Sequence, residues 1–312
     1  MTAVLLGALG LTLSLVVPGP LARARWTARA PVAAVVLWQA VTLAAVLCAL
    51  GVVLAGPEEL VRSVGAGAHL TVAALVVALA VAAVVVLRLL VSLAQVAYRS
   101  RVRRARHRLL LDLLHGVEEH GRFDEDVPPG VLRVLDGNVP FAYCLPGRSP
   151  RIVLSQGTLR VLTTQQIAAV LAHERAHLRA RHDIVLESFT AFYRAVPSPL
   201  RSRAPLDAVH LLLEACADDV AGRRHDTASL CGALLTLGGS ADALMGDIEP
   251  DGQGRDVERE RQWRLDRLAP GAPGPDLRLS IAVYAVAAAI LVLPTVVLVV
   301  PWLDQALRTW PL

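Results

Sequence analysis

The chain has 312 residues, 54% of them hydrophobic, and its mean hydropathy is +0.51. This composition is too apolar for an ordinary soluble protein and indicates a membrane protein. The 31 basic residues are all arginines and exceed the 27 acidic residues by a net charge of +4, which we attribute to membrane topology rather than to direct nucleic-acid binding. The four cysteines have no C-x-x-C spacing, so we expect reduced thiols rather than a disulfide framework.

Four apolar stretches predict four transmembrane helices. Three are expected in residues 1–98, at about 3–17, 31–56 and 69–97. The fourth is expected from Leu279 to about Trp302, within a last segment, 277–312, that ends in a short external tail. The intervening residues 99–276 are polar and long enough for one compact domain.

The arginines set the expected orientation, because loops rich in Arg face the cytoplasm. One such loop holds Arg23, Arg25 and Arg29, and a second basic run extends from Arg99 to Arg108. A short loop with Glu58 and Glu59 is then outside, as are both termini, and the polar domain is cytoplasmic. We expect the run from Arg99 to bind anionic lipid headgroups of the bilayer rather than nucleic acid.

The polar domain is predicted to be α+β. An amphipathic helix from Leu109 to His120 precedes three strands, Val131–Leu135, Val139–Leu145 and Arg151–Ser155. Asp136-Gly137 is a hairpin signal and Pro146–Pro150 a turn, which together predict a β-meander. An exposed edge of this meander could hold an extended peptide as an added strand. The alternative is a meander that only packs the neighbouring helix.

The central motif is His173-Glu174-Arg175-Ala176-His177, in a predicted helix from Thr164 to about Arg181 that follows a T-x-x-Q capping box. Residues four apart share a helix face, so His173 and His177 can bind one cation. Glu174 lies about 100° round, within reach of a water on that metal but poorly placed as a ligand. Two imidazoles and a carboxylate suit Zn²⁺ with an open catalytic position. The alternative is a helix with two histidines and no metal.

A second helix, Pro205 to Arg223, is predicted to supply the third ligand. Glu214 lies among apolar residues, where a bare carboxylate is costly unless it binds a metal or a partner. Asp218 is one turn on, and we expect it to accept the second N–H of a zinc histidine. Cys216 is a weaker candidate ligand. A salt-bridged Glu214 with an unrelated surface Asp218 is the alternative.

Two further histidines, His182 and His225, are candidates for this site. His182 lies about 140° round the helix from His177, so we expect it to face elsewhere and to hydrogen-bond near the helix end, with Asp183. His225 follows Glu214 by about three turns on the same face and is a weak candidate for stabilising an oxyanion.

This residue set predicts hydrolysis of peptide bonds. Zinc would lower the pKa of its bound water to about 7 and polarise the scissile carbonyl. Glu174, as catalytic base, would take a proton from that water and pass it to the leaving amine. An HExxH motif with a distant Glu is the set of a gluzincin metalloendopeptidase.

Four segments resemble the metalloprotease part of the BlaR/MecR-type antirepressor receptors: 141–147, 152–159, 171–177 and 214–218. The resemblance implies zinc ligands His173, His177 and Glu214, with Glu174 as base and Asp218 behind the ligands. It also implies that the substrate is a cytoplasmic, DNA-binding transcriptional repressor, cleaved after a signal. Those receptors carry an extracellular penicillin-binding sensor after the fourth span, and this chain ends at Leu312. Direct β-lactam sensing is therefore not expected.

Other functions are compatible with parts of the sequence. A more distant likeness to HtpX-type and CaaX-processing membrane proteases implies protein quality control. A catalytically inactive membrane signalling scaffold is a second alternative, although the motif residues are intact. A channel or transporter is disfavoured, because the apolar spans carry almost none of the polar residues that a pathway needs.

Overall fold

The computed structural model describes residues 2–113, 130–198, 201–237 and 257–309. These residues form two compact units. The first comprises Met1–Gln95, Phe189–Val209 and Pro275–Leu312, and the second comprises Val96–Ser188 and His210–Gly274. Most residues of the apolar helices belong to the first unit and the residues of the HExxH motif to the second.

Helices make up the described part of the first unit. They are α1 (Thr2–Leu11), the π-helix η1 (Thr12–Val16), α2 (Pro18–Ala22), the 3₁₀-helix η2 (Arg25–Arg29), α3 (Pro31–Gly65), the first part of α4 (His69–Leu113) and α12 (Leu277–Thr309). Four segments are long and apolar enough to cross a membrane: Thr2–Ala22, Pro31–Gly65, His69–Leu111 and Leu277–Val297. The predicted four apolar helices are therefore present, and they are consistent with a membrane protein.

Helix α3 is the centre of this bundle and packs against both α1 and α12. A Cβ on Gly10 would touch Cys48, and one on Gly56 would collide with Leu79. Glycines at such contacts let helices approach closely, which is how apolar helices gain packing energy where no hydrophobic effect acts between them. The glycines therefore set the spacing of α1, α3 and α4.

The predicted loop at Glu58 and Glu59 is wrong, because α3 continues through Pro57 to Gly65. A carboxylate oxygen of Glu59 accepts a hydrogen bond from the backbone N–H of Thr2 at 2.6 Å, where the start of α1 leaves donors unsatisfied. Glu58 pairs with Arg62 one turn on. These contacts favour a helical backbone beyond the proline.

Helix α4 runs unbroken from the apolar stretch into the basic run, as predicted, and its described part ends at Leu113. The rest of the helix expected from Leu109 lies outside the described residues. Arg104 pairs with Asp183 at 3.2 Å and with Glu187 at 2.6 Å, and Arg108 donates to the carbonyl of Pro146 at 2.8 Å. These two arginines thus bind protein groups, whereas Arg99, Arg101 and Arg106 are exposed.

The three strands form a sheet of order β1-β3-β2, with β1 at Leu132–Leu135, β2 at Ala142–Leu145 and β3 at Arg151–Ser155. Strand β3 pairs parallel with β1 and antiparallel with β2. The predicted meander is therefore wrong, because β1 and β2 do not pair. The turn at Pro146–Pro150 is confirmed as the β2–β3 connection.

The burial of β3 explains this order. Ile152 and Leu154 pack with Ile167 and Leu171 of the motif helix, whereas Val153 packs on the opposite face with Leu111 of α4. A strand covered on both faces belongs in the middle of a sheet. The backbone N–H of Gly157, in the helix that follows β3, donates to the carbonyl of Gly137 at 2.8 Å. The segment after β1 therefore contacts this helix instead of forming a hairpin with β2.

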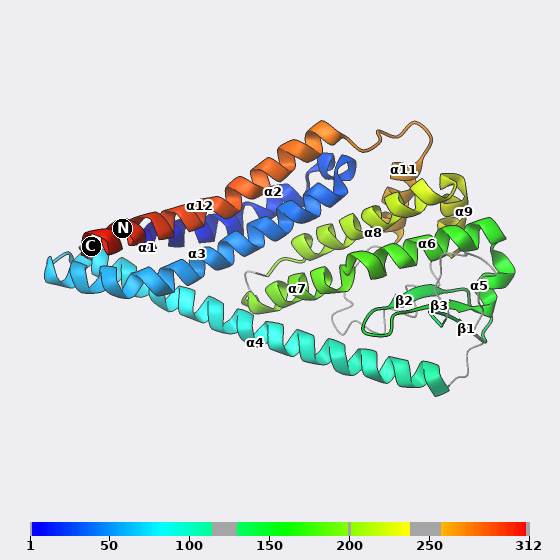
Figure 1. The fold of residues 1–312 in the computed structure, drawn as a ribbon, viewed down its shortest axis with the longest axis horizontal. Helices are drawn as coiled ribbons and strands as arrows, with labels where there is room; N and C mark the ends of the chain where they lie inside the picture. The colour runs from blue at the N-terminus through cyan, green and yellow to red at the C-terminus, as the bar shows by residue number, and fades with distance from the viewer. Residues whose placement is uncertain (1, 114–129, 199–200, 238–256, 310–312) are drawn as a thin grey trace. The chain divides into compact units, whose positions relative to one another are not determined.

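The helices of this region are α5 (Gln156–Val161), α6 (Thr164–Ala180), α7 (His182–Ala195), α8 (Ala204–Arg224), α9 (Thr227–Leu237) and α11 (Val257–Leu268). Helix α6 begins at the predicted capping box between Thr163 and Gln166. Further along it, Ala169 and Ala172 pack with Ala221 of α8 and Leu230 of α9. Helices α6 and α8 run antiparallel and side by side, with these alanines packed between them (Figure 1).

Candidate metal centre

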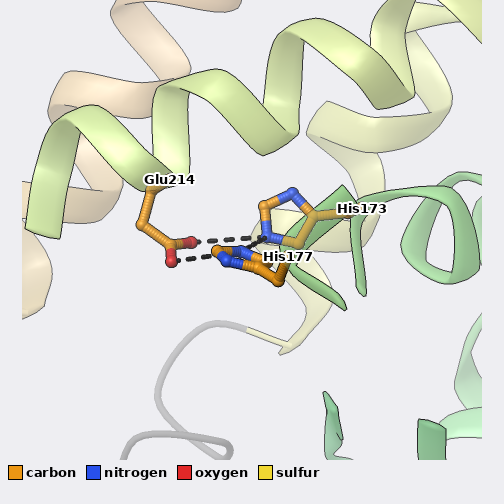
Figure 2. A group of neighbouring side chains, drawn as sticks. All are labelled: His173, His177 and Glu214. Carbon is orange, nitrogen blue, oxygen red and sulfur yellow. Dashed lines mark hydrogen bonds and ion pairs between the residues drawn. The ribbon is translucent and has the colours of Figure 1, made fainter. Parts of the chain in front are cut away.

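Three predicted ligands meet between α6 and α8 (Figure 2). The Nε2 atoms of His173 and His177 are 3.0 Å apart. From α8, Oε2 of Glu214 lies 3.3 Å from Nε2 of His173, and Oε1 lies 3.3 Å from Nε2 of His177. All three ligand atoms lie within 4.8 Å of one another. Two imidazoles and one carboxylate thus converge on one point.

These distances can be compared with the needs of zinc. Bonds of about 2.0–2.2 Å in a tetrahedron put neighbouring ligand atoms about 3.4 Å apart. The two nitrogens are 3.0 Å apart, each lies 3.3 Å from a different oxygen of Glu214, and with one oxygen as donor all three atoms lie within 4.8 Å of one another. Borderline-soft imidazole nitrogens and one carboxylate oxygen are also the donors of catalytic zinc sites. The donor set therefore fits Zn²⁺ with a fourth position left for another group.

Asp218 lies behind His173. Its Oδ1 is 3.0 Å from Nδ1 of His173, on the side of the ring away from Glu214, and the residue is 1% exposed. A carboxylate here fixes the tautomer in which Nε2 is free to bind a metal. The structure thus brings Asp218 beside Nδ1 of His173.

His182 was expected to face elsewhere, and this is wrong. Its Nδ1 lies 2.8 Å from Nδ1 of His177, within hydrogen-bond distance. Helix α6 ends at Ala180, and Arg181 is left-handed, with φ 52° and ψ 44°. The prediction of 140° assumed an unbroken helix, whereas this break redirects the chain and returns His182 to the site. Each motif histidine thus has a polar partner at Nδ1: Asp218 for His173 and His182 for His177.

Replacing His182 by alanine is expected to weaken zinc binding about 10–100-fold, because the ring of His177 loses the partner that orients it. Activity at saturating zinc is expected to stay near that of the parent. Zinc competition with a chelator measures the affinity, and His225→Ala is the matched control. Unchanged affinity in His182→Ala would contradict an orienting role.

Glu174 is partly buried beside the three ligands, and burial raises its pKa above the usual range of a glutamate. Its carboxylate shares a hydrogen bond with the thiol of Cys144 on β2, a contact that the sequence did not predict. Burial, together with the charge of Glu174, also raises the pKa of Cys144, so the thiol keeps its proton and can donate it. The edge strand β2 therefore lies next to the predicted base.

The two weaker candidates lie outside the group of three. Cys216 is buried, and burial raises the pKa of its thiol to about 12, which opposes the thiolate that binds metals. His225 follows the end of α8 at Arg224 and lines a separate pocket with Thr164 and Ser229. Among the described residues, Glu214 is the carboxylate that completes the cluster.

Arg264 of α11 is the main site residue that the sequence did not reveal. Its Nε and Nη2 donate to the two carboxylate oxygens of Asp218 at 2.9 and 2.6 Å, and its Nη1 lies 2.9 Å from Oε2 of Glu214. Next to it, Arg267 pairs with Asp219 at 2.5 Å. The only sequence signal is the spacing of three on α11, where Arg261, Arg264 and Arg267 share one face.

Arg264 also balances the charge of the centre. With neutral imidazoles, the carboxylates of Glu174, Glu214 and Asp218 and one guanidinium leave a net charge of −2. A divalent cation neutralises this charge, as a buried site requires. The arrangement therefore fits a metal ion of charge +2.

The pKa values of Glu214 and His177 agree with a cation site, whereas His173 keeps a proton that a metal ion would have to displace. Burial acts to raise the pKa of Glu214, but His177 and Arg264 outweigh it and hold that pKa well below the usual range. Burial lowers the pKa of His177 to about 3. For His173, burial acts in the same direction, but hydrogen bonds to Asp218 and Glu214 raise its pKa to about 10. Glu214 is thus a carboxylate and His177 a neutral imidazole, the forms that bind metals.

Replacing Arg264 by alanine is expected to destabilise the metal-free protein by about 3–5 kcal/mol, because two buried carboxylates lose their shared partner. Added zinc should raise the melting temperature more in this variant than in the parent, since the ion offsets the unpaired charge. Thermal unfolding in detergent with and without zinc measures both effects. Arg261→Ala, which breaks a pair with the more exposed Glu258, is the control. An equal zinc response in Arg264→Ala and in the parent would contradict charge compensation by Arg264.

No solved structure matches the chain. Residues 101–203 match the family model of peptidase family M48, a segment that contains the HExxH helix but neither Glu214 nor Asp218. The match does not distinguish a BlaR/MecR-type subfamily. This part of the chain is therefore similar to metallopeptidases of family M48.

Proposed function

We propose that this protein is an integral-membrane, zinc-dependent endopeptidase of the gluzincin type. The observation that carries the proposal is the convergence of His173, His177 and Glu214 from two helices at distances that fit zinc. The metallopeptidase match over 101–203 and the four apolar helices support it independently.

The residues of the site have separate roles in this proposal. When bound, zinc supplies a Lewis acid that polarises a carbonyl and activates water near neutral pH. Glu174 takes the proton of the attacking water and passes it to the leaving amine. Asp218 and His182 hold the two imidazoles in position.

Strand β2 is the proposed docking edge for the substrate. It pairs on one side with β3, and no described strand pairs with its other side. Cys144 on β2 contacts Glu174, so a peptide added along this edge would pass the base. Extended peptides bind sheet edges through main-chain hydrogen bonds, with limited dependence on sequence.

The proposed substrate is a cytoplasmic or membrane-associated protein, a transcriptional repressor in a signalling pathway. The support is the resemblance to BlaR/MecR-type receptors and an orientation that puts the protease domain in the cytoplasm. Exposed Arg99, Arg101 and Arg106 and the loop with Arg23 and Arg25 favour that orientation. Both ends of the chain are then outside.

A comparison of cells tests substrate and activity together. Membrane and soluble proteins from cells with the parent chain, Glu174→Gln or Glu258→Gln are compared for fragments that vanish in Glu174→Gln alone. Fragments of one DNA-binding protein would support the repressor pathway. Fragments of many damaged membrane proteins would indicate HtpX-like quality control instead, and no difference would indicate an inactive scaffold.

A further inference from the structure

The connection between α7 and α8 packs with the apolar helices rather than with the metal centre. We call the described residues 189–198 and 201–209 the α7–α8 tip, since they belong to the unit of the four apolar segments. Phe189 is 3% exposed and meets the buried Trp38 of α3 edge-on, with ring centroids 6.2 Å apart. Ser92 of α4 donates to the carbonyl of Ala191 at 2.8 Å.

Arg88 of α4 also contacts the α7–α8 tip. It is the only charged residue between Leu70 and Tyr98, in the stretch that would cross the membrane. A charge at such a position is expensive unless it is paired or bonded to backbone carbonyls. Nε of Arg88 donates to the carbonyl of Ala195, the last residue of α7, at 2.7 Å.

The end of α7 is capped in the way that an apolar surrounding requires. The last carbonyls of a helix have no partner within it, and each unsatisfied group in lipid costs several kcal/mol. Arg201 donates to the carbonyls of Arg194 and Val196 at 3.1–3.3 Å, and Arg88 serves Ala195 between them. Three consecutive carbonyls are therefore satisfied by two guanidinium groups.

The outer side of the tip is uncharged. The exposed residues described around the turn are Pro197, Ser198, Ser202 and Ala204. Arg201 lies over the ring of Tyr193, 5.0 Å from its centroid, and Arg203 pairs with Asp207 at 3.6 Å. Both arginines of the turn are thus directed to protein groups.

We infer that the α7–α8 tip is a re-entrant hairpin that dips into the lipid bilayer and returns to the side from which it came. The inference rests on the proposed membrane location of the four apolar helices. Irregular backbone at membrane depth is tolerated where protein satisfies its polar groups, and Arg88, Ser92 and Arg201 do this here. The hairpin would tie both helices that lead to the metal centre to the membrane.

Spin labels on the full chain in phosphatidylcholine–phosphatidylglycerol vesicles test this. The variants Ser198→Cys at the tip, Ser149→Cys in the exposed β2–β3 turn and Val84→Cys on the lipid-facing side of α4 are each labelled, with the unsubstituted chain as the blank. Collision rates are measured with oxygen, which concentrates in the bilayer, and with a water-soluble nickel complex. We expect oxygen to dominate at positions 198 and 84 and nickel to dominate at 149.

Two outcomes would overturn the inference, and they can be told apart. Nickel access at 198 with oxygen access at 84 would leave α4 in the membrane and remove the tip from it. Nickel access at both 84 and 198 would refute the membrane location itself, and the hairpin with it.

Discussion

Glu174→Gln is expected to lower the rate of peptide hydrolysis about 10²–10⁴-fold, the usual contribution of a general base. The amide has nearly the shape of the carboxylate but cannot accept the proton of the attacking water. Glu174 is outside the group of three ligands, so the zinc content should equal that of the parent. Hydrolysis of a fluorogenic peptide by purified protein and metal analysis of the same sample give both quantities.

Glu258→Gln makes the same chemical change on an exposed part of α11 and should hydrolyse peptide at the parent rate. It controls for any general effect of the lost charge. Parent-like activity in Glu174→Gln would show that the base is another residue. A variant that loses zinc as well as activity would instead move Glu174 into the set of metal ligands.

His173→Ala is expected to abolish activity and to lower zinc affinity by more than the ~100-fold that loss of an outer partner costs. The change removes a ligand and leaves Asp218 without its contact to the imidazole. Arg264 still pairs with that carboxylate, so the fold should survive. Zinc content after dialysis and peptide hydrolysis measure the effect.

Chelation of the parent provides a second route to the same state. Activity should fall to background when a strong chelator removes the metal and return when zinc is added. His225→Ala, a histidine outside the cluster, should keep both zinc and activity. Full activity of the chelated parent, or of His173→Ala, would rule out a metal-dependent mechanism.

The local part of the site was predictable because helix geometry is periodic. The spacing of four puts His173 and His177 on one face, and the capping box at Thr163 marks the start of their helix. Both depend on neighbours within a few residues. The apolar helices were predictable for a related reason, because each is one continuous stretch of sequence whose length and composition can be read directly.

The predictions that the structure contradicts are those in which a local sequence pattern competes with tertiary packing. Asp136-Gly137 suits a hairpin, but burial on both faces of β3 puts this strand between β1 and β2. His182 lies beside His177, contrary to the prediction, because one left-handed residue, Arg181, interrupts the helical period. A single backbone torsion of this kind has no reliable signal in the side chains around it.

The sequence by itself determined the HExxH pair, the apolar helices and a buried carboxylate, Glu214, that needs a partner. Only the tertiary structure decided which groups meet: Glu214 with both imidazoles, and Arg264 with Glu214 and Asp218. The physical reason is that hydrogen bonds within a helix fix neighbours four residues apart, whereas contacts between helices depend on side-chain size and on compensation of buried charge. Ala169, Ala172 and Ala221 pack between α6 and α8, and the carboxylates between these helices then require Arg264 from a distant part of the chain.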